Sequence, residues 1–412
     1  MSRILLVLIL VIAFPRNHLY SINLDDLIKK SLLQYPGYKI KEYDTIISNY
    51  NLKLSISPFY PQIEAGVSRR QYYDDLEGEN ASITLTTSYN IFSGFRDVLD
   101  LMISKIRLRL SDFIFEDYRR FIIKEVSNLY FDALRNKYIL DSYKNIVDSS
   151  KKALDIARER FNVGRIRKID LLQAEVNYSR SEYEYQIYIQ TLKNILVNLS
   201  TYTGETYSIK DTFETAFIDV TVSDIVYYLQ RGYEKNLNIV SKKYETEVAG
   251  KEINKSFSEF APSVDLYLEE GRFYDELASS EYSTGATAGI ALNWDIFTGF
   301  RRYYNVMVQK NKYYQSLMGE KLAKVELKEQ VGNLHNNILS YNTQFYFLSD
   351  LLKFSEKNYD LTLESFILGK SDILELLDAR DRFEEALIDY YTARFSIIRD
   401  YNELKYIAGI DE

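Results

Sequence analysis

Tyr89-Asn-Ile-Phe-Ser-Gly-Phe-Arg96 and Trp294-Asp-Ile-Phe-Thr-Gly-Phe-Arg301 are two copies of one motif, separated by 205 positions (294 − 89). Phe161-Asn-Val-Gly-Arg165 and Phe366-Ile-Leu-Gly-Lys370 are the copies of a second motif, and they have the same separation (366 − 161 = 205). Two unrelated motifs at one offset indicate that a structural unit has been duplicated. The sequence therefore predicts two tandem repeats of similar fold.

Each repeat contains two segments in which apolar and polar residues alternate. A period of two over about ten residues, with one apolar and one polar face, is typical of transmembrane β-strands. The alternation also fits a pair of soluble hairpins that pack one face on a helical core. The predicted hairpins cover about 61–92 and 262–297. Their apolar positions are Ile63, Ala65, Val67, Ile83, Leu85, Tyr89 and Ile91, and then Val264, Leu266, Leu268, Ala288, Ile290, Leu292, Trp294 and Ile296.

Long helices are predicted after the hairpins. From Phe95 to Val163 the chain has neither proline nor glycine, which permits one very long helix. In the second repeat, apolar residues step alternately by four and three positions, as in helices that coil around neighbours. Each repeat is thus predicted to contain a helix, a β-hairpin, a very long helix, a glycine turn and a helix. The apolar seam is Leu327, Val331, Leu334, Ile338, Tyr341, Phe345, Leu348 and Leu352.

Residues 1–21 are predicted to be a secretory signal. Arg3 precedes an apolar run from Ile4 to Phe14, which is too short to span a bilayer but fits the apolar region of a signal peptide. We place the cleavage near Ser21, against the alternative of a buried N-terminal strand or helix. No later segment has the run of apolar residues that a membrane-spanning helix needs.

The composition excludes several classes of function. The chain has no cysteine and only two histidines, so thiol chemistry, disulfides and cysteine-ligated metals are excluded. A net charge of −8 argues against nucleic acid as a partner. The sequence contains no phosphate-binding loop and no catalytic constellation. We therefore predict a protein that is not an enzyme and that has no cofactor and no metal site.

The predicted strands are too few to close a barrel within one chain. We place the first repeat at 22–211 and the second at 212–412, with one hairpin in each. Lipid does not tolerate open sheet edges, so strands that enter a membrane must be pooled by several chains. Two chains would give eight strands (2 × 4) and three would give twelve (3 × 4), and the strand pattern does not choose between them.

The repeated unit, the Phe161-Asn-Val-Gly164 turn and the Ile-Phe-x-Gly-Phe-Arg exits from both hairpins resemble the TolC family of outer-membrane efflux proteins. Leu24-Asp25-Asp26-Leu27 and Gln34-Tyr35-Pro36 also resemble the start of the family's first repeat, whereas repeat two has Asn236-Leu237 in place of Tyr35-Pro36. The resemblance implies a mainly α fold with membrane β-strands. It implies a homotrimer whose 12-stranded β-barrel lies in outer-membrane lipid and continues into the periplasm as a long α-helical barrel.

The same resemblance implies a function. Proteins of this family are passive exit ducts of tripartite efflux or type I secretion systems, with a periplasmic adaptor (membrane fusion protein) and an inner-membrane pump as partners. The alternative, from another class, is a soluble periplasmic coiled-coil adaptor or scaffold protein. Such adaptors usually have one helical hairpin with β-rich flanking domains, whereas this sequence has two similar repeats with a β-hairpin in each.

Acidic residues after the two glycine turns form the candidate gate. Asp170 lies six residues after Gly164, while Glu375 and Asp378 lie six and nine after Gly369. In proteins that this chain resembles, acids at these places line the periplasmic constriction. Rings of carboxylates attract cations and influence selectivity. The alternative is a solvated helix start, where acids favour the positive end of the helix dipole.

The resemblance also implies a lock at the constriction, formed by a tyrosine and an arginine. This chain has Phe366 and Ser371 at those places, so Phe366 is a candidate gate residue, and Arg165, Arg167 or Lys370 are candidates to replace the missing arginine. In the family, the glycine turns meet the adaptor. The predicted docking tips are Gly164, Arg165, Gly369 and Lys370.

Overall fold

The computed structural model describes residues 21–72, 78–214, 220–275 and 279–410. The predicted signal segment 1–21 lies outside the described residues except for Ser21, and so do residues 73–77 and 276–278 between the paired strands. Among the helices in these ranges, none is both long enough and apolar enough to cross a membrane.

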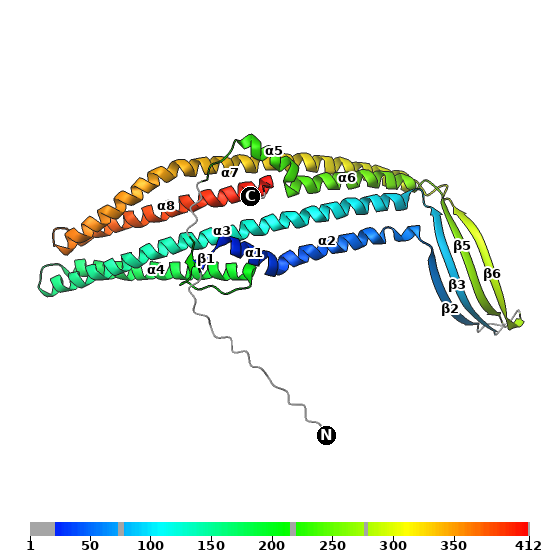
Figure 1. Ribbon diagram of the computed structural model, residues 1–412, viewed down its shortest axis with the longest axis horizontal. Coiled ribbons are helices and arrows are strands. Elements are labelled where there is room, and N and C mark those ends of the chain that lie inside the picture. Colours follow the sequence, from blue (N-terminus) through cyan, green and yellow to red (C-terminus); the bar gives the residue numbers. More distant parts are fainter. Residues whose placement is uncertain (1–20, 73–77, 215–219, 276–278, 411–412) are drawn as a thin grey trace, which may run out of the picture. The chain divides into compact units, whose positions relative to one another are not determined.

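Figure 1 shows the elements in chain order. The first part contains β1 (Ser21–Ile22), α1 (Leu24–Gln34), α2 (Pro36–Leu54), the 3-10 helix η1 (Ser57–Phe59), β2 (Gln62–Tyr72), β3 (Gly78–Phe92), α3 (Arg96–Asn162) and α4 (Lys168–Thr203). The second part contains β4 (Thr212–Phe213), α5 (Ile225–Lys235), α6 (Leu237–Ser258), β5 (Ser263–Asp275), β6 (Ser279–Asn293), α7 (Arg301–Ile367) and α8 (Ile373–Ala408). The mainly helical fold with tandem repeats is as predicted.

The element bounds repeat with the offset of the motifs. Helices α3 and α7 both have 67 residues and begin 205 positions apart (301 − 96). Helices α4 and α8 both have 36 residues and are also 205 positions apart (373 − 168). The hairpin strands are offset by 201 positions (263 − 62 and 279 − 78). The four additional residues of the second repeat therefore lie between β6 and α7.

This insertion changes the end of the second hairpin. The alternating pattern predicts strand structure up to about residue 297, but β6 ends at Asn293. Trp294 turns out of the ladder and donates its Nε1–H to Phe260 O at 3.0 Å. Asp295 pairs with the buried Arg302, with 2.9 Å between Oδ2 and Nη2. These contacts hold Trp294 and Asp295 outside the strand, so the apolar Ile296 lies in the connection and not in a strand.

Both repeats interrupt the helix that precedes the hairpin, by different means. In the first repeat α2 begins with Pro36, which has no N–H to donate to α1 and favours the first position of a helix. In the second repeat Asn236 ends α5 and caps α6, because its Oδ1 accepts from the backbone N–H of Asn238 at 3.0 Å. Asn236-Leu237 therefore keeps the helix interruption that Tyr35-Pro36 makes in the first repeat.

Strands β2, β3, β5 and β6 form an antiparallel sheet in this order, so the hairpins of the two repeats lie side by side (Figure 1). Directly paired residues point to the same face of a sheet. Leu266 pairs with Tyr89 on one side and with Ile290 on the other. Ala65 pairs with Leu85 in the same way. The register thus places those predicted apolar residues of both repeats that have ladder partners on one common face.

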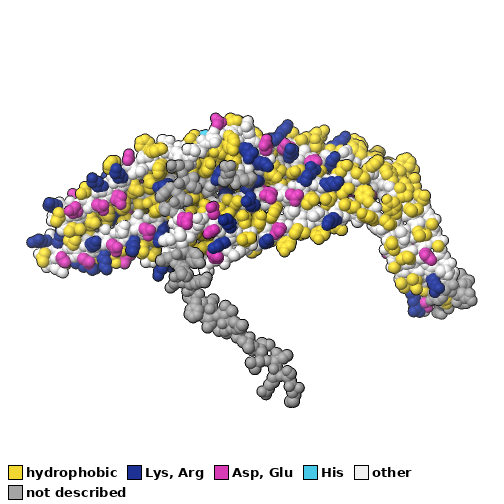
Figure 2. Space-filling model, viewed as in Figure 1, with side chains coloured by type: hydrophobic (Ala, Val, Ile, Leu, Met, Phe, Trp, Pro, Cys, Tyr) yellow, Lys and Arg dark blue, Asp and Glu magenta, His cyan; other side chains and the backbone are white. Residues whose placement is uncertain are grey.

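This apolar face is open to solvent in the single chain. Ile63 and Ile290 are each 69% exposed, so they do not pack on a helical core within the described chain. In Figure 2, hydrophobic side chains gather on the end of the sheet next to the helices, and charged side chains appear towards the other end. The opposite face is polar and contains Gln62, Glu64, Ser68, Arg70, Ser82, Thr84, Thr86, Ser88, Asn90, Asp265, Glu269 and Asn293.

The chain packs as two compact units, and each unit draws on both repeats. The sheet unit comprises Pro36–Lys124, Val222–Ile338 and Asp400–Glu412, and the turn unit comprises Met1–Tyr35, Glu125–Thr221 and Leu339–Arg399. The predicted repeat boundary at 211/212 is therefore not a boundary of packing, and it stays a prediction. Within the sheet unit, the predicted seam positions Leu327, Val331 and Ile338 are buried.

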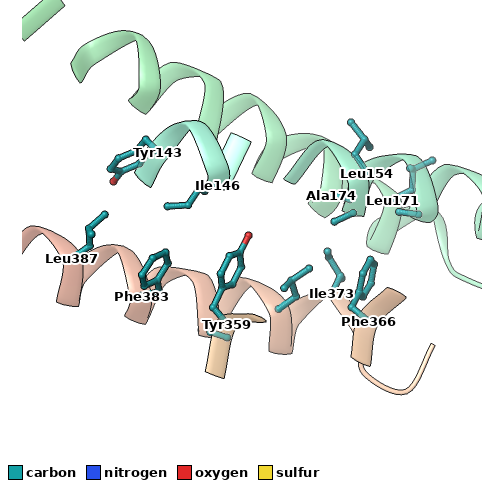
Figure 3. Packing of buried hydrophobic residues seen from close by; sticks show 14 of the residues in the cluster. Tyr143, Ile146, Leu154, Leu171, Ala174, Tyr359, Phe366, Ile373, Phe383 and Leu387 are labelled. Carbon is teal, nitrogen blue, oxygen red and sulfur yellow. The ribbon is translucent and has the colours of Figure 1, made fainter. Parts of the chain in front are cut away.

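The core of the turn unit lies between segments of α3, α4, α7 and α8 (Figure 3). Burial of these side chains is the main term that holds the four helices together, at roughly 1.5–3 kcal/mol for each large apolar side chain. The labelled core residues are Tyr143, Ile146 and Leu154 of α3, Leu171 and Ala174 of α4, Tyr359 and Phe366 of α7, and Ile373, Phe383 and Leu387 of α8.

Candidate gate and docking turns

Both glycine turns end a long helix in the left-handed conformation. Gly164 has a φ of +72° and Gly369 a φ of +77°. The backbone N–H of Arg165 donates to Arg160 O at 2.8 Å, and Lys370 makes the equivalent bond at 2.9 Å. These bonds form the Schellman arrangement, which satisfies carbonyls at a helix end. The predicted tip residues are all exposed, so the two turns present basic side chains to solvent.

Asp170 is held at the start of α4 by Arg167. The carboxylate accepts from the Arg167 backbone N–H at 3.0 Å and from the guanidinium at 3.2 and 2.9 Å. This hydrogen bonding to Arg167 lowers the pKa of Asp170 below its usual range. The residue therefore caps its own helix, and its charge is compensated by a neighbouring base.

Glu375 occupies the equivalent position of the second repeat (375 − 170 = 205) but has a different environment. Asp372 takes over the capping role, because its Oδ1 accepts from the backbone N–H of Glu375 at 2.9 Å. The Glu375 side chain is exposed. Asp378 lies one turn further and pairs with Arg382 at 3.1 Å, but this pair is 65% and 69% exposed and contributes little stability. The turn of α8 therefore presents two solvated carboxylates.

These acids do not gather into a metal site in the single chain. Across the described ranges, no three acidic or histidine side chains come close enough to hold a metal ion. Asp170 differs from Glu375 because Arg167 neutralises it, and from Asp378 because the pair of Asp378 with Arg382 is largely exposed. Of the three predicted gate acids, only the two on α8 are thus disposed to act on ions in solvent.

Phe366 is buried in the core and is held by a residue of the other repeat. Its side chain is 4% exposed and packs in the cluster between the helix pairs. Arg160, in the last turn of α3, donates Nη2–H to Phe366 O at 2.7 Å and to Ile367 O at 3.0 Å. The guanidinium carbon also lies 5.1 Å from the centre of the Phe366 ring. Arg160, at the end of α3, thus donates to two of the last carbonyls of α7, and Phe366 O also accepts from the Gly369 N–H at 3.0 Å.

Arg160 is a contact residue of the candidate gate that the sequence did not reveal. None of the three proposed substitutes makes this contact, and Arg167 is occupied by Asp170. A signal existed in the sequence, because a basic residue in the last turn of a helix favours the negative end of its dipole. Arg160 has Ser365 as its equivalent in the second repeat (365 − 160 = 205), so the base is present in one copy only.

The comparisons with known proteins agree with the overall fold. A family model described as outer membrane efflux protein matches residues 47–205 and 229–410. No curated protein matches the sequence. The Campylobacter jejuni CmeC outer membrane channel is similar in structure, with a TM-score of 0.80 and 17% identity over 94% of this chain and 87% of the other. VceC of Vibrio cholerae has a TM-score of 0.77 and 14% identity over 94% and 96%.

A third similar structure is described as the open state of the Neisseria gonorrhoeae MtrE outer membrane channel. Its TM-score is 0.72 and its identity is 16%, over 94% of this chain and 88% of that one. The family model covers most of both repeats, including the hairpins and both glycine turns. The comparisons favour an outer-membrane efflux channel over a soluble adaptor. The chain belongs to the outer membrane efflux protein family.

Proposed function

We propose that this outer-membrane efflux channel is a homotrimer and acts as the passive exit duct of a tripartite efflux or type I secretion system. Three chains supply the twelve strands of one barrel (3 × 4), with the apolar face of each four-stranded sheet in outer-membrane lipid and the polar face lining the pore. A periplasmic adaptor and an inner-membrane pump are the partners. The observation that supports the assembly is that each unit of the chain has exposed apolar side chains along two different helices.

In the sheet unit, these two helices are connected in sequence to the two edge strands of the sheet. Strands β2 and β6 are the edge strands, α2 leads into β2, and α7 follows β6. Helix α2 has no buried residue. Because the two edges are built from different elements, the α2 edge of one copy can meet the α7 edge of the next, and such contacts close into a ring. The exposed apolar residues are Ile40, Tyr43, Ile47, Tyr50 and Leu54 on α2, and Tyr304, Val308, Met318, Leu322 and Val325 on α7.

The turn unit repeats this arrangement with α4 in place of α2. Exposed apolar residues recur along α4 and along the second part of α7 at the spacing of coiled-coil seams. The same helix, α7, therefore contributes an exposed apolar edge to each of the two units. These residues are Val176, Tyr183, Ile187 and Val197 on α4, and Phe347, Leu351, Phe354 and Leu361 on α7.

Detergent extraction of the outer-membrane fraction, followed by native mass measurement, tests the assembly. We expect a mass of three chains. Substitution of Ile47 and Tyr50 on α2 by serine should yield folded monomers, because it removes two of the exposed apolar side chains of that edge. A native monomer in the parent protein, or a chain that fractionates without detergent, would overturn the proposed duct.

The acids of α8 are proposed to form the periplasmic constriction, together with Asp170 and the buried Phe366. Three copies of Glu375 and Asp378 around one axis would place six carboxylates in a ring (3 × 2). Carboxylates at such short separation repel one another, and together they attract cations. Since Asp170 is neutralised by Arg167, the two acids of α8 carry the charge of this ring.

Glu375→Gln with Asp378→Asn is expected to remove most of the block by divalent or trivalent cations in a planar bilayer. The block in the parent channel should arise from the periplasmic side only, because the ring lies there. The channel should also lose cation preference. Glu42→Gln with Asp44→Asn makes the same charge change on α2 and should leave the block unchanged. An equal block in both double variants would show that the acids of α8 are only solvated helix residues.

The glycine turns are proposed to dock the adaptor, through Arg165 and Lys370. Gly164→Val is expected to abolish complementation of efflux while trimers still form, because a β-branched residue at a φ of +72° costs about 1–2 kcal/mol and distorts the tip. A Cβ at Gly164 meets no atom within 4 Å, so the effect is one of backbone conformation. Gly332→Ala is the matched control, since its Cβ also meets open space but lies within α7. Loss of the trimer in Gly164→Val would mean that the turn serves folding alone.

A further inference from the structure

The polar face of β5 carries an aromatic ring between two acids. Asp265, Tyr267 and Glu269 are spaced by two residues, so all three point to the face of the sheet that bears Thr86 and Asn90. Glu64 of β2 joins them across the sheet, because Thr86 pairs with Glu64 on one side and with Glu269 on the other. We call Glu64, Asp265, Tyr267 and Glu269 the β5 stripe.

The ring of Tyr267 lies flat on the sheet. Its cross-strand partner is Gly289 of β6. A Cβ built at Gly289 would lie 2.5 Å from the Tyr267 hydroxyl and 2.6 Å from the adjacent ring carbon, so the ring occupies the space that a side chain would need. Tyr267 remains 38% exposed. A ring that lies against the wall presents its face, which carries the negative side of the aromatic quadrupole, to the space in front of the sheet.

Within the described ranges, the acids beside this ring are not neutralised by a basic side chain. Asp265 is oriented by Asn90, whose Nδ2–H donates to Asp265 Oδ1 at 2.6 Å. Among the residues that the structure describes, Glu64 and Glu269 form no ion pair with a lysine or arginine. On the same face, Arg70 lies near the other end of β2. The three acids of the β5 stripe therefore leave an excess of negative charge around Tyr267.

We propose that the β5 stripe binds lipophilic organic cations on their way through the pore, and that such cations are a class of cargo. This inference rests on the proposed duct, because the polar face lines a pore only when several chains pool their sheets. Attraction of a cation to an aromatic face and to nearby carboxylates is the chemistry that recognises quaternary ammonium groups. Three chains supply three stripes, and each combines an accessible ring face with flanking negative charge.

Block of the channel by tetrabutylammonium in a planar bilayer tests the proposal. The cation is added on the extracellular side of the purified full-length protein, and its half-blocking concentration is measured. We expect Tyr267→Leu to raise that concentration by about twofold to fivefold, as for an exposed cation–π contact. Tyr267→Phe retains the ring and should keep the parent value. Glu269→Gln should weaken the block similarly, whereas benzenesulfonate, a ring-bearing anion, should not block the parent channel.

Glu270→Gln is the matched control for the charge. Glu270 is the next residue of β5, but it pairs with Leu85 and therefore lies on the opposite, apolar face. Gly289→Ala provides a second variant that leaves every charge in place. Its Cβ must push the Tyr267 ring away from the wall, so the block should weaken without loss of an acid or of the ring.

The outcomes separate this inference from the proposed duct. Tyr267→Leu should leave block by divalent cations from the periplasmic side unchanged, since that block belongs to Glu375 and Asp378. If the parent protein conducts but Tyr267→Leu, Glu269→Gln and Glu270→Gln are all blocked equally by tetrabutylammonium, the β5 stripe is not a binding site. If the parent protein does not conduct at all, both the duct and this inference are overturned.

Discussion

Arginine in place of Leu85, Ile290 or Leu292 should prevent the chain from accumulating in the outer membrane. The register places all three side chains on the apolar face of the sheet, and each is at least 47% exposed in the single chain. On a lipid-facing surface, an arginine at the bilayer midplane costs about 2–4 kcal/mol, and the cost falls towards the interfaces. In the proposed trimer, each of the three chains bears this cost. The measurement is the amount of detergent-stable trimer in the outer-membrane fraction.

The neighbouring residues provide the control. Thr86→Arg and Asn293→Arg each introduce the same side chain one position away, on the polar face. We expect both variants to reach the outer membrane at the parent level, because the arginine then faces water in the pore. Equal loss on the two faces would mean that the sheet is sensitive to any bulky charge. Equal tolerance of arginine on the two faces would mean that the sheet does not lie in the membrane.

The faces of the sheet could be predicted from the sequence because the side-chain period of a strand is fixed by its backbone. The residue at which β6 ends could not be predicted in this way. Trp294 and Ile296 continue the apolar alternation, yet the four-residue insertion lets Trp294 bond to Phe260 and Asp295 bond to Arg302. These bonds join residues of the alternating segment to residues outside it, which the alternation of apolar and polar residues cannot reveal. The strand therefore ends at Asn293.

The candidate gate was predictable in part, for a similar reason. The left-handed glycines follow from local backbone geometry, so Gly164 and Gly369 could be predicted. The equivalent acids Asp170 and Glu375 could be located, but not the fact that Arg167 neutralises only the first. That difference depends on the residue three positions earlier, which is a base in one copy and Asp372 in the other. A repeat therefore predicts position more reliably than it predicts electrostatic environment.

Arg160→Ala is expected to weaken the contact between the ends of α3 and α7 in the turn unit and so to favour an open pore. The variant removes both hydrogen bonds to Phe366 O and Ile367 O, and it removes the cation from the negative end of the α7 dipole. Hydrogen bonds to charged groups contribute about 1.5–3 kcal/mol each. Loss of one such contribution changes the ratio of open to closed turns by about tenfold to a hundredfold. The expected result is a larger single-channel conductance and a shorter closed time.

Arg158→Ala separates this effect from a general loss of positive charge. Arg158 lies two residues earlier on α3, is 53% exposed, and reaches Asp155 and Glu175 only at 3.9 and 3.7 Å. Its removal should leave the conductance at the parent value. Arg160→Lys keeps the charge but has no planar fork to hold over the Phe366 ring, so it should restore closure only in part. Phe366 O also accepts from the backbone N–H of Gly369 at 3.0 Å. If Arg160→Ala conducts like the parent, the contact with Arg160 is not what holds the two helix ends together.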